Sequence, residues 1–218
     1  MVTDQPIGRA VLYVVSNVRP EAHAAFTHWC DSIHHFDTMR IDGFLSLRRF
    51  ELVDGSVEPG EREYRLLTLY QVADAGDADF STPAYQQHTA TYAPPPEGVT
   101  DGIEYERHVL RRREHTDRAS QPVGDACISV VGVDGPWLKD AAARAAGCDG
   151  TLNAYVVDGD DCAVLLVDVE SREQGAAVLS ALSDVPHGGC RRSLQLFAQV
   201  FPRTGVLARD RVVVPPRA

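Results

Sequence analysis

One order of predicted elements occurs twice in this chain of 218 residues, and that repeat constrains the fold more than any other feature. The first copy lies between residues 8 and 113 and reads strand, helix, strand, strand, helix, strand. Its elements are expected at 11–15, 20–36, 45–52, 64–72, from 81 to before Pro94, and at 104–112. The second copy lies between residues 125 and 203. Its elements are expected at 127–131, 136–146, from 151, and at 162–169, 172–182 and 193–201.

Prolines and glycines mark several boundaries of these elements. Pro20 and Pro83 suit the first turn of a helix, because a backbone N–H at that position makes no hydrogen bond within the helix and proline lacks one. The run 94–96 is three prolines and must end the second helix. Asp54-Gly55 and Pro59-Gly60 predict a turn between the second and third strands.

The order βαββαβ is the ferredoxin-like arrangement. A sheet with one apolar face cannot stay uncovered in water, so we expect the two units to pair within the chain as one α+β barrel. Residues 114–124 are polar and predict a linker, and 204–218 form a tail in which 210–216 could add a short edge strand. The second copy is shorter where the first is richest in histidine, so we expect any chemistry in the N-terminal half.

Composition and charge limit the classes of partner. The net charge of −10 argues against a nucleic-acid partner, and the short run Arg111–Arg113 is expected to be the polar end of a strand. No apolar run is long enough to span a membrane, and the N-terminus lacks the pattern of a secretory signal, so a cytoplasmic protein is expected. Five scattered cysteines predict reduced thiols. We expect a small-molecule substrate as partner, and a monomer with an internal pseudo-dimer or a homodimer.

The segments 26–34 and 41–50 resemble the dimeric α+β barrel superfamily, in particular its EthD-type branch. The resemblance rests on Trp29, on His34 five residues later, on Gly43-Phe44, and on the strand that carries Arg48 and Arg49. It covers residues 8–113 well and 125–203 in outline. The resemblance implies the fold but leaves the reaction open, because the superfamily includes cofactor-free monooxygenases, polyketide cyclases, lactone isomerases, dehydratases and haem enzymes. His35 stands where relatives usually have an apolar residue, and the second copy has no counterpart of Trp29 or His34, so one site is expected.

The first helix carries the principal catalytic candidate. Ala22, Phe26, Trp29 and Ile33 follow helical spacing and predict a buried stripe. His34 lies at the edge of this stripe, where an imidazole can line a pocket between helix and sheet and act as general acid or base. The alternative is a half-buried histidine satisfied by a backbone carbonyl. His28, Asp31 and His35 are expected to face solvent.

The second helix and the strands supply further candidates. Tyr85, His88 and Tyr92 share one helical face and could orient a carbonyl or phenolate substrate, with Tyr85 and His88 close to the chemistry. Ordinary aromatic packing is the alternative. We expect Tyr13, Trp29 and Tyr70 to contact the substrate in the same cavity.

Arg48 and Arg49 are adjacent in a strand and must point to opposite faces. At most one can enter the pocket, where it would stabilise an enolate or carboxylate. The other is expected to be solvated.

No cofactor is expected. His23, Cys30 and His34 share a face, but the chain has no His-Glu-x-x-His signature and one helix rarely supplies a complete metal shell. Gly-x-Gly-x-x-Gly and Gly-x-Ser-x-Gly are absent, and no haem ligand stands out.

These observations favour a cofactor-independent enzyme that cyclises, dehydrates, isomerises or decarboxylates an aromatic or polyketide-like substrate. A cofactor-free monooxygenase of a phenol and a non-catalytic ligand-binding or accessory protein are the alternatives.

Overall fold

The computed structural model describes residues 2–113, 119–202 and 206–209. Its first half contains β1 (Thr3–Pro6), β2 (Ala10–Asn17), α1 (His23–Trp29), η1 (Cys30–His34), α2 (His35–Thr38), β3 (Phe44–Val57), β4 (Leu66–Val72), η2 (Ala75–Ala78), α3 (Pro83–Thr89) and β5 (Glu104–Arg112). Its second half contains β6 (Ser120–Val123), β7 (Ala126–Gly132), α4 (Pro136–Ala146), β8 (Thr151–Asp158), β9 (Ala163–Val169), α5 (Arg172–Ser183), β10 (Arg191–Phe201) and β11 (Leu207–Ala208).

The main sheet is antiparallel and runs in the order β10-β7-β9-β8-β5-β2-β4-β3-β11. In each half the first long strand lies between two others: β2 between β4 and β5, and β7 between β9 and β10. Two pairings join the halves. β5 pairs with β8, and residues 49–57 of β3 pair with 193–201 of β10, which closes the sheet on itself.

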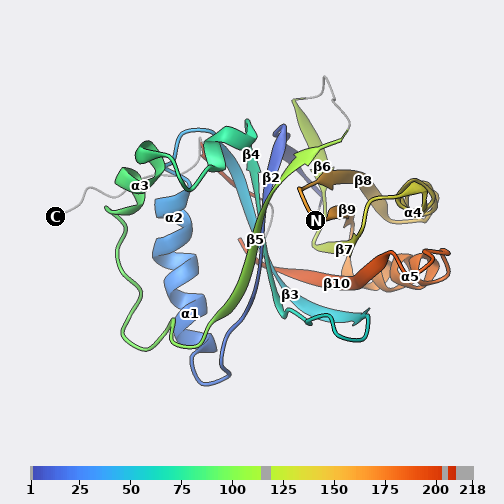
Figure 1. Cartoon of the computed structure of the whole chain (residues 1–218), viewed down its shortest axis with the longest axis horizontal. Helices are drawn as coiled ribbons and strands as arrows, with labels where there is room; N and C mark the ends of the chain where they lie inside the picture. Colours follow the sequence, from blue (N-terminus) through green and yellow to red (C-terminus); the bar gives the residue numbers. More distant parts are fainter. Residues whose placement is uncertain (1, 114–118, 203–205, 210–218) are drawn as a thin grey trace.

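Apolar side chains fill three layers around this sheet. Along β2 the side chains alternate, with Val11 and Tyr13 inside the closed sheet and Leu12 against the helices of the first half. Figure 1 shows α1, α2 and α3 on one side of the strands and α4 and α5 on the other. The inner layer takes residues from both halves, including Phe50, Leu67, Leu166 and Phe197.

In the second half, α4 and α5 cover one face of the strands. Trp137 and Leu138 from α4 and Val178 from α5 pack against Ile128 and Leu165 of the strands. The expected elements of this half match the structure closely, and the helix predicted at 136–146 spans those residues. The helix-facing side of these strands is therefore buried by the helices of the same half.

The turn predicted between the second and third strands lies at Pro59-Gly60, and only the position Asp54-Gly55 is wrong. Asp54 and Gly55 lie within β3, which continues to Val57 because its last residues pair with β10 across the two halves. A Cβ at Gly55 would lie 2.4 Å from the carbonyl oxygen of Leu194, so glycine is needed there for close strand approach rather than for a turn.

The expected linker and tail both contain strands. β6 lies within residues 114–124 and pairs with β1 in a separate two-stranded sheet. β11 pairs with β3, so the chain returns to the first half after β10. The edge strand expected at 210–216 lies outside the described residues. None of the helices in the described ranges is long and apolar enough to cross a membrane.

Candidate functional site

A π-turn interrupts the first helix. The backbone N–H of His35 bonds to the carbonyl of Cys30, five residues back, so η1 is wider than the α-helix on either side. Such single π-turns are frequent at functional sites. The widening places residues five apart above one another, and the rings of Trp29 and His34 stack with centroids 4.6 Å apart and planes 23° from parallel.

Two expectations about this helix are wrong. His35 was expected to face solvent but is only 2% exposed, and Asp31 is half-buried and paired with Arg49. A regular α-helical count advances each residue by about 100°, and one extra residue in a turn shifts the positions after it by about that angle. His34 and His35 therefore both face the sheet, and His35 does not point into solvent.

A cavity of about 400 Å³ lies between the strands of the first half and its helices. Its apolar wall is largely aromatic and aliphatic: Leu12, Val14, Phe26, Trp29, Phe80 and Ile103. Its polar lining includes His34, His35, Thr38, Tyr70, Tyr85 and Arg107. An apolar cavity with a few converging polar groups is the usual form of a small-molecule site.

His34 presents a neutral imidazole to this cavity. Burial lowers its pKa from 6.5 to about 4, and the nearby carboxylate of Asp37 offsets only part of that shift. Its Nδ1 is sealed from solvent and has no hydrogen-bond partner, which leaves Nε2 as the nitrogen able to reach the cavity. The alternative, in which a backbone carbonyl satisfies the buried His34 ring, is not seen among the described residues, because the buried Nδ1 has no partner.

His35 lies deeper, between the sheet and the end of β10. Its Nδ1 is 3.2 Å from the Tyr70 hydroxyl, and its ring stacks on Phe201 with centroids 5.5 Å apart. Burial, with further contributions from His34 and Arg49, holds the pKa of His35 well below its ordinary value. Burial also raises the pKa of Tyr70 well above its ordinary value, so both groups are neutral at pH 7.

The second-helix candidates separate in the structure. Tyr85 lines the cavity, whereas His88 donates Nε2–H to the Asp37 carbonyl oxygen at 3.3 Å and is not among the lining residues. Tyr92 packs its ring at 5.9 Å from His34 and 5.6 Å from His88. α3 ends at Thr89, before Tyr92, so the expected shared helical face is wrong.

Tyr13 was expected in the same cavity and lies elsewhere. Its side chain points into the closed sheet, and its hydroxyl is 3.0 Å from the Ser129 hydroxyl. Tyr70 lies on the helix-facing side and lines the cavity as expected. β2 and β4 pair in register, and the strand alternation decides which face each tyrosine takes.

Arg48 and Arg49 point to opposite faces, as alternation predicts, but neither lines the cavity and neither is solvated. Arg48 is fully buried inside the sheet, where it pairs with Asp168 and donates to the Gly124 carbonyl at 3.3 Å. Arg49 donates to both oxygens of Asp31, at 3.0 and 2.8 Å. The expectation of one solvated arginine is wrong because both faces of β3 are covered.

Sequence reasoning missed Arg107 on β5. Its guanidinium lies over the Phe80 ring, 3.8 Å from the centroid, and it lines the cavity while remaining exposed. It is the charged side chain among the lining residues, and no ion pair of Arg107 occurs within the described ranges. Alternation along the strand predicted at 104–112 could have placed Arg107 and Val109 on one face, but not which face carries the cavity.

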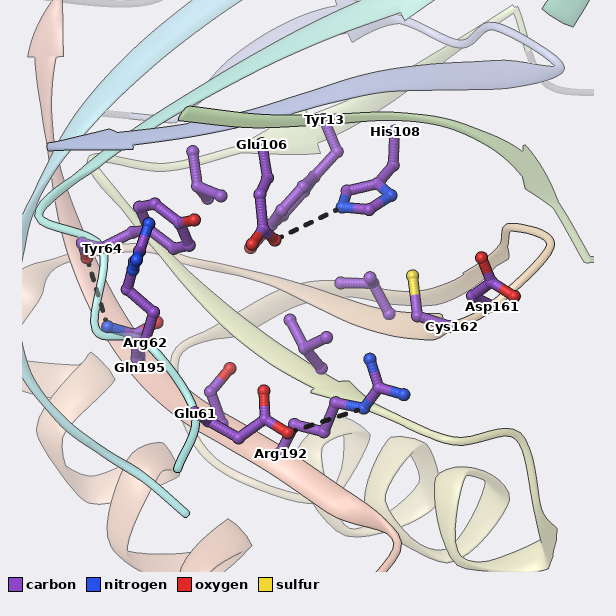
Figure 2. A pocket seen from close by; sticks show the side chains of 14 residues that line it. Tyr13, Glu61, Arg62, Tyr64, Glu106, His108, Asp161, Cys162, Arg192 and Gln195 are labelled. Atoms are coloured by element: carbon purple, nitrogen blue, oxygen red, sulfur yellow. Dashed lines mark hydrogen bonds and ion pairs between the residues drawn. The ribbon is translucent and has the colours of Figure 1, made fainter. Parts of the chain in front are cut away.

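A second, smaller pocket of about 100 Å³ opens inside the closed sheet (Figure 2). Figure 2 shows two contacts among its polar side chains: His108 lies 3.6 Å from Glu106, and Arg192 lies 4.0 Å from Glu61. Burial raises the pKa of the Cys162 thiol there, which disfavours the reactive thiolate. We therefore take the larger cavity as the candidate site.

Metal binding finds no geometric support in the described part of the chain, where no three His, Cys, Asp or Glu side chains cluster suitably. His23, one of the three residues considered for a metal, lies 3.3 Å from the Glu51 carboxylate instead.

Comparison with known proteins defines the fold. No family model matches the sequence, and no curated protein matches it either. Among solved structures, an anthrone oxidase-like protein aligns over 98% of each chain at 11% identity and a TM-score of 0.52. A protein assigned only provisionally as a chlorite dismutase aligns over 89% of this chain and 96% of its own, at 10% identity and a TM-score of 0.51. These alignments show that the chain shares the α+β fold of the two solved structures.

Proposed function

We propose that the cavity is the active site of a cofactor-independent small-molecule enzyme in which His34 acts as general base or acid. The observation that carries this proposal is the neutral His34 imidazole in a cavity with apolar, partly aromatic walls that also holds Tyr70 and Tyr85. Cyclisation, dehydration, isomerisation and decarboxylation all need a proton moved at a bound carbon or oxygen, which is the step such a group can perform.

The cavity restricts how His34 can work. Burial disfavours the imidazolium, so a proton moves to His34 at low cost only when it leaves an anion beside the ring. An enolate or phenolate formed from the substrate would be such an anion. The Tyr85 hydroxyl lies in the same lining and can donate a hydrogen bond to it. The aromatic wall favours a planar, aromatic or polyketide-like substrate.

We also propose that the two halves are tandem ferredoxin-like units of the EthD-type branch, and that they pair within one chain. The repeated strand order and the two pairings between the halves support this origin. Pairing within the chain is the reason to expect either a monomer with an internal pseudo-dimer or a dimer of such chains.

His34→Ala tests the catalytic role. Turnover of phenolic and polyketide-like substrates is measured without added cofactor and with a metal chelator present, beside His28→Ala as control, because His28 is exposed on the same helix. A general base contributes about 10²- to 10⁴-fold in rate, so His34→Ala should lose activity by that factor while His28→Ala stays near wild type. Equal activity in both variants would remove His34 from the mechanism.

A cofactor-free oxygenation of a phenol is the second candidate. The likeness to an anthrone oxidase-like protein across nearly the whole chain favours including it. Oxygen consumption in step with substrate loss would identify oxygenation, and substrate loss in the absence of oxygen would identify proton-transfer chemistry. Ligand binding without turnover, unchanged in His34→Ala, would instead identify a binding or accessory protein.

A further inference from the structure

We propose that His35 is a positioning residue: it turns the Tyr70 hydroxyl into a hydrogen-bond acceptor toward the cavity, so that the site selects ligands with an O–H or N–H donor at that point. This inference rests on the cavity being the ligand site proposed above. It follows from the chain of contacts Arg49, Asp31, His35 and Tyr70, whose hydrogen positions can be assigned one after another.

The first step is the state of Asp31. Arg49 donates from Nε to Oδ1 at 3.0 Å and from its terminal nitrogen to Oδ2 at 2.8 Å. A guanidinium stays charged in proteins, and a carboxylate bound to it in this two-point manner is ionised. The Asp31 oxygens are therefore acceptors only.

The second step is the tautomer of His35. Its Nε2 lies 3.8 Å from Oδ1 of Asp31, too far for a good hydrogen bond but close enough for a clear electrostatic preference. An N–H directed at the carboxylate is attracted, whereas a bare nitrogen lone pair there is repelled. The proton of the neutral ring therefore belongs on Nε2, which leaves Nδ1 bare.

The third step is the direction of the bond to Tyr70. A bare Nδ1 can only accept, so the Tyr70 hydroxyl, 3.2 Å away, donates to it. Thr38 also approaches Tyr70, and because the Thr38 hydroxyl donates its proton to the His34 carbonyl at 2.9 Å, it too can only accept from Tyr70. Both neighbours of the Tyr70 hydroxyl are therefore acceptors that draw its single proton away from the cavity, and the Tyr70 oxygen offers the cavity lone pairs only.

The surroundings hold this arrangement in place. His35 is 2% exposed and its ring stacks on Phe201 from the second half of the chain, with planes 26° apart. Turning the ring over by 180° would keep the stack but replace Nδ1 by a carbon beside the Tyr70 hydroxyl and so break that bond. A rigid neighbour with fixed polarity is what a selective hydrogen bond requires.

The tautomer can be measured directly on the wild-type protein. The ring nitrogens of His35 are observed by ¹⁵N NMR and assigned by comparison with His35→Phe or, if that variant does not fold, through the intact backbone assignment. A proton on Nε2 and a bare Nδ1 at pH 7 are expected. A proton on Nδ1 would overturn the proposal without reference to any ligand.

Binding then tests the consequence. Calorimetry compares 2-naphthol, which has a donor, with 2-methoxynaphthalene, which has the same rings and no donor. Wild type should prefer 2-naphthol by roughly 3- to 10-fold, the size of one net hydrogen bond. Tyr70→Phe should bring the ratio to about 1. His35→Phe, which keeps a ring against Phe201, should weaken or reverse the preference, because the Tyr70 hydroxyl then loses its ring-nitrogen acceptor and can turn its proton toward the cavity.

The control is His28→Phe, the same exchange at an exposed position of the same helix, and it should keep the wild-type ratio. A 2-naphthol preference that persists in folded His35→Phe would overturn the role of His35. None of these readouts needs turnover. A protein with the expected preference and no activity with any substrate would keep this proposal and refute the enzymatic one.

Discussion

The guanidinium of Arg48 and the carboxylate of Asp168 form an ion pair inside the closed sheet, joining β3 of the first half to β9 of the second. Both side chains are at most 1% exposed. Arg48 also bonds to the carbonyl of Gly124, so one arginine of the first half contacts two segments of the second. The arginine that was a candidate for the active site serves the contact between the halves.

Arg48→Met should destabilise the protein strongly, because it leaves Asp168 as an uncompensated buried charge. A loss of about 3–5 kcal/mol is expected in denaturant unfolding. The double variant Arg48→Met/Asp168→Leu should regain most of that loss, since apolar pairs often replace buried ion pairs without penalty.

The control for this prediction is the exposed pair Arg62–Glu104, 3.6 Å apart, where Arg62→Met should cost less than about 1 kcal/mol. Similar losses at both pairs, or no recovery in the double variant, would show that the buried charge is not the cause.

The pH dependence of stability should carry the signature of His34. Its pKa is about 4 when folded and near the ordinary 6.5 when unfolded, so the unfolded chain binds the proton first. Stability should be constant above the unfolded pKa and fall as pH drops from about 6.5 to about 4, by at most roughly 3 kcal/mol from this residue.

Urea unfolding between pH 8 and pH 4 measures this slope, and His34→Gln should make it shallower without removing the part that belongs to His35. An identical slope in wild type and His34→Gln would mean that His34 is not held neutral by burial.

Arg107 should act as the anion anchor that the sequence assigned to Arg48 or Arg49. Arg107→Gln should weaken binding of 2-naphthoate by about 10-fold or more, because a hydrogen bond to a charged group is lost. Binding of 2-naphthol should be unchanged, and the effect on the carboxylate should shrink as salt is added.

Arg111→Gln is the matched control, since Arg111 is exposed on the same strand four residues on and does not line the cavity. Equal effects of the two variants would indicate general charge rather than a specific contact.

Gly43 should be irreplaceable where the helices of the first half lead into β3. It has φ of +88°, and a Cβ there would lie 2.3 Å from a carboxylate oxygen of Asp77. Gly60 has a similar φ of +91° with open space around it. Gly60→Ala should cost about 1 kcal/mol for backbone strain alone, and Gly43→Ala clearly more, in thermal or denaturant unfolding. Equal losses in the two variants would show that the Asp77 side chain can move away from the added Cβ without a cost in stability.

The order of the main strands and helices, the strand alternation and the bounds of α4 and α5 were determined locally, and the sequence alone was sufficient to predict them. The second half illustrates this: the helix at 136–146 begins at a proline, where no backbone donor is lost, and follows one apolar stripe. Alternation alone separated Arg48 from Arg49. The helices of the first half were not predicted as well, because α1 begins at His23 rather than near Pro20 and α3 ends at Thr89.

Only the tertiary structure decided what each face met. No periodicity in the sequence predicts the π-turn at Cys30–His34, and His35 lies in contact with Tyr70 and Phe201 rather than at the expected surface. Closure of the sheet buries the Arg48 side chain on the inner face of β3. A buried guanidinium requires an acidic partner, and that partner, Asp168, is 120 residues away in the sequence. The spacing of residues along the sequence reveals which side chains of one helix or strand share a face. It does not report which distant carboxylate, ring or strand will occupy the space beside it, because long-range contacts decide that.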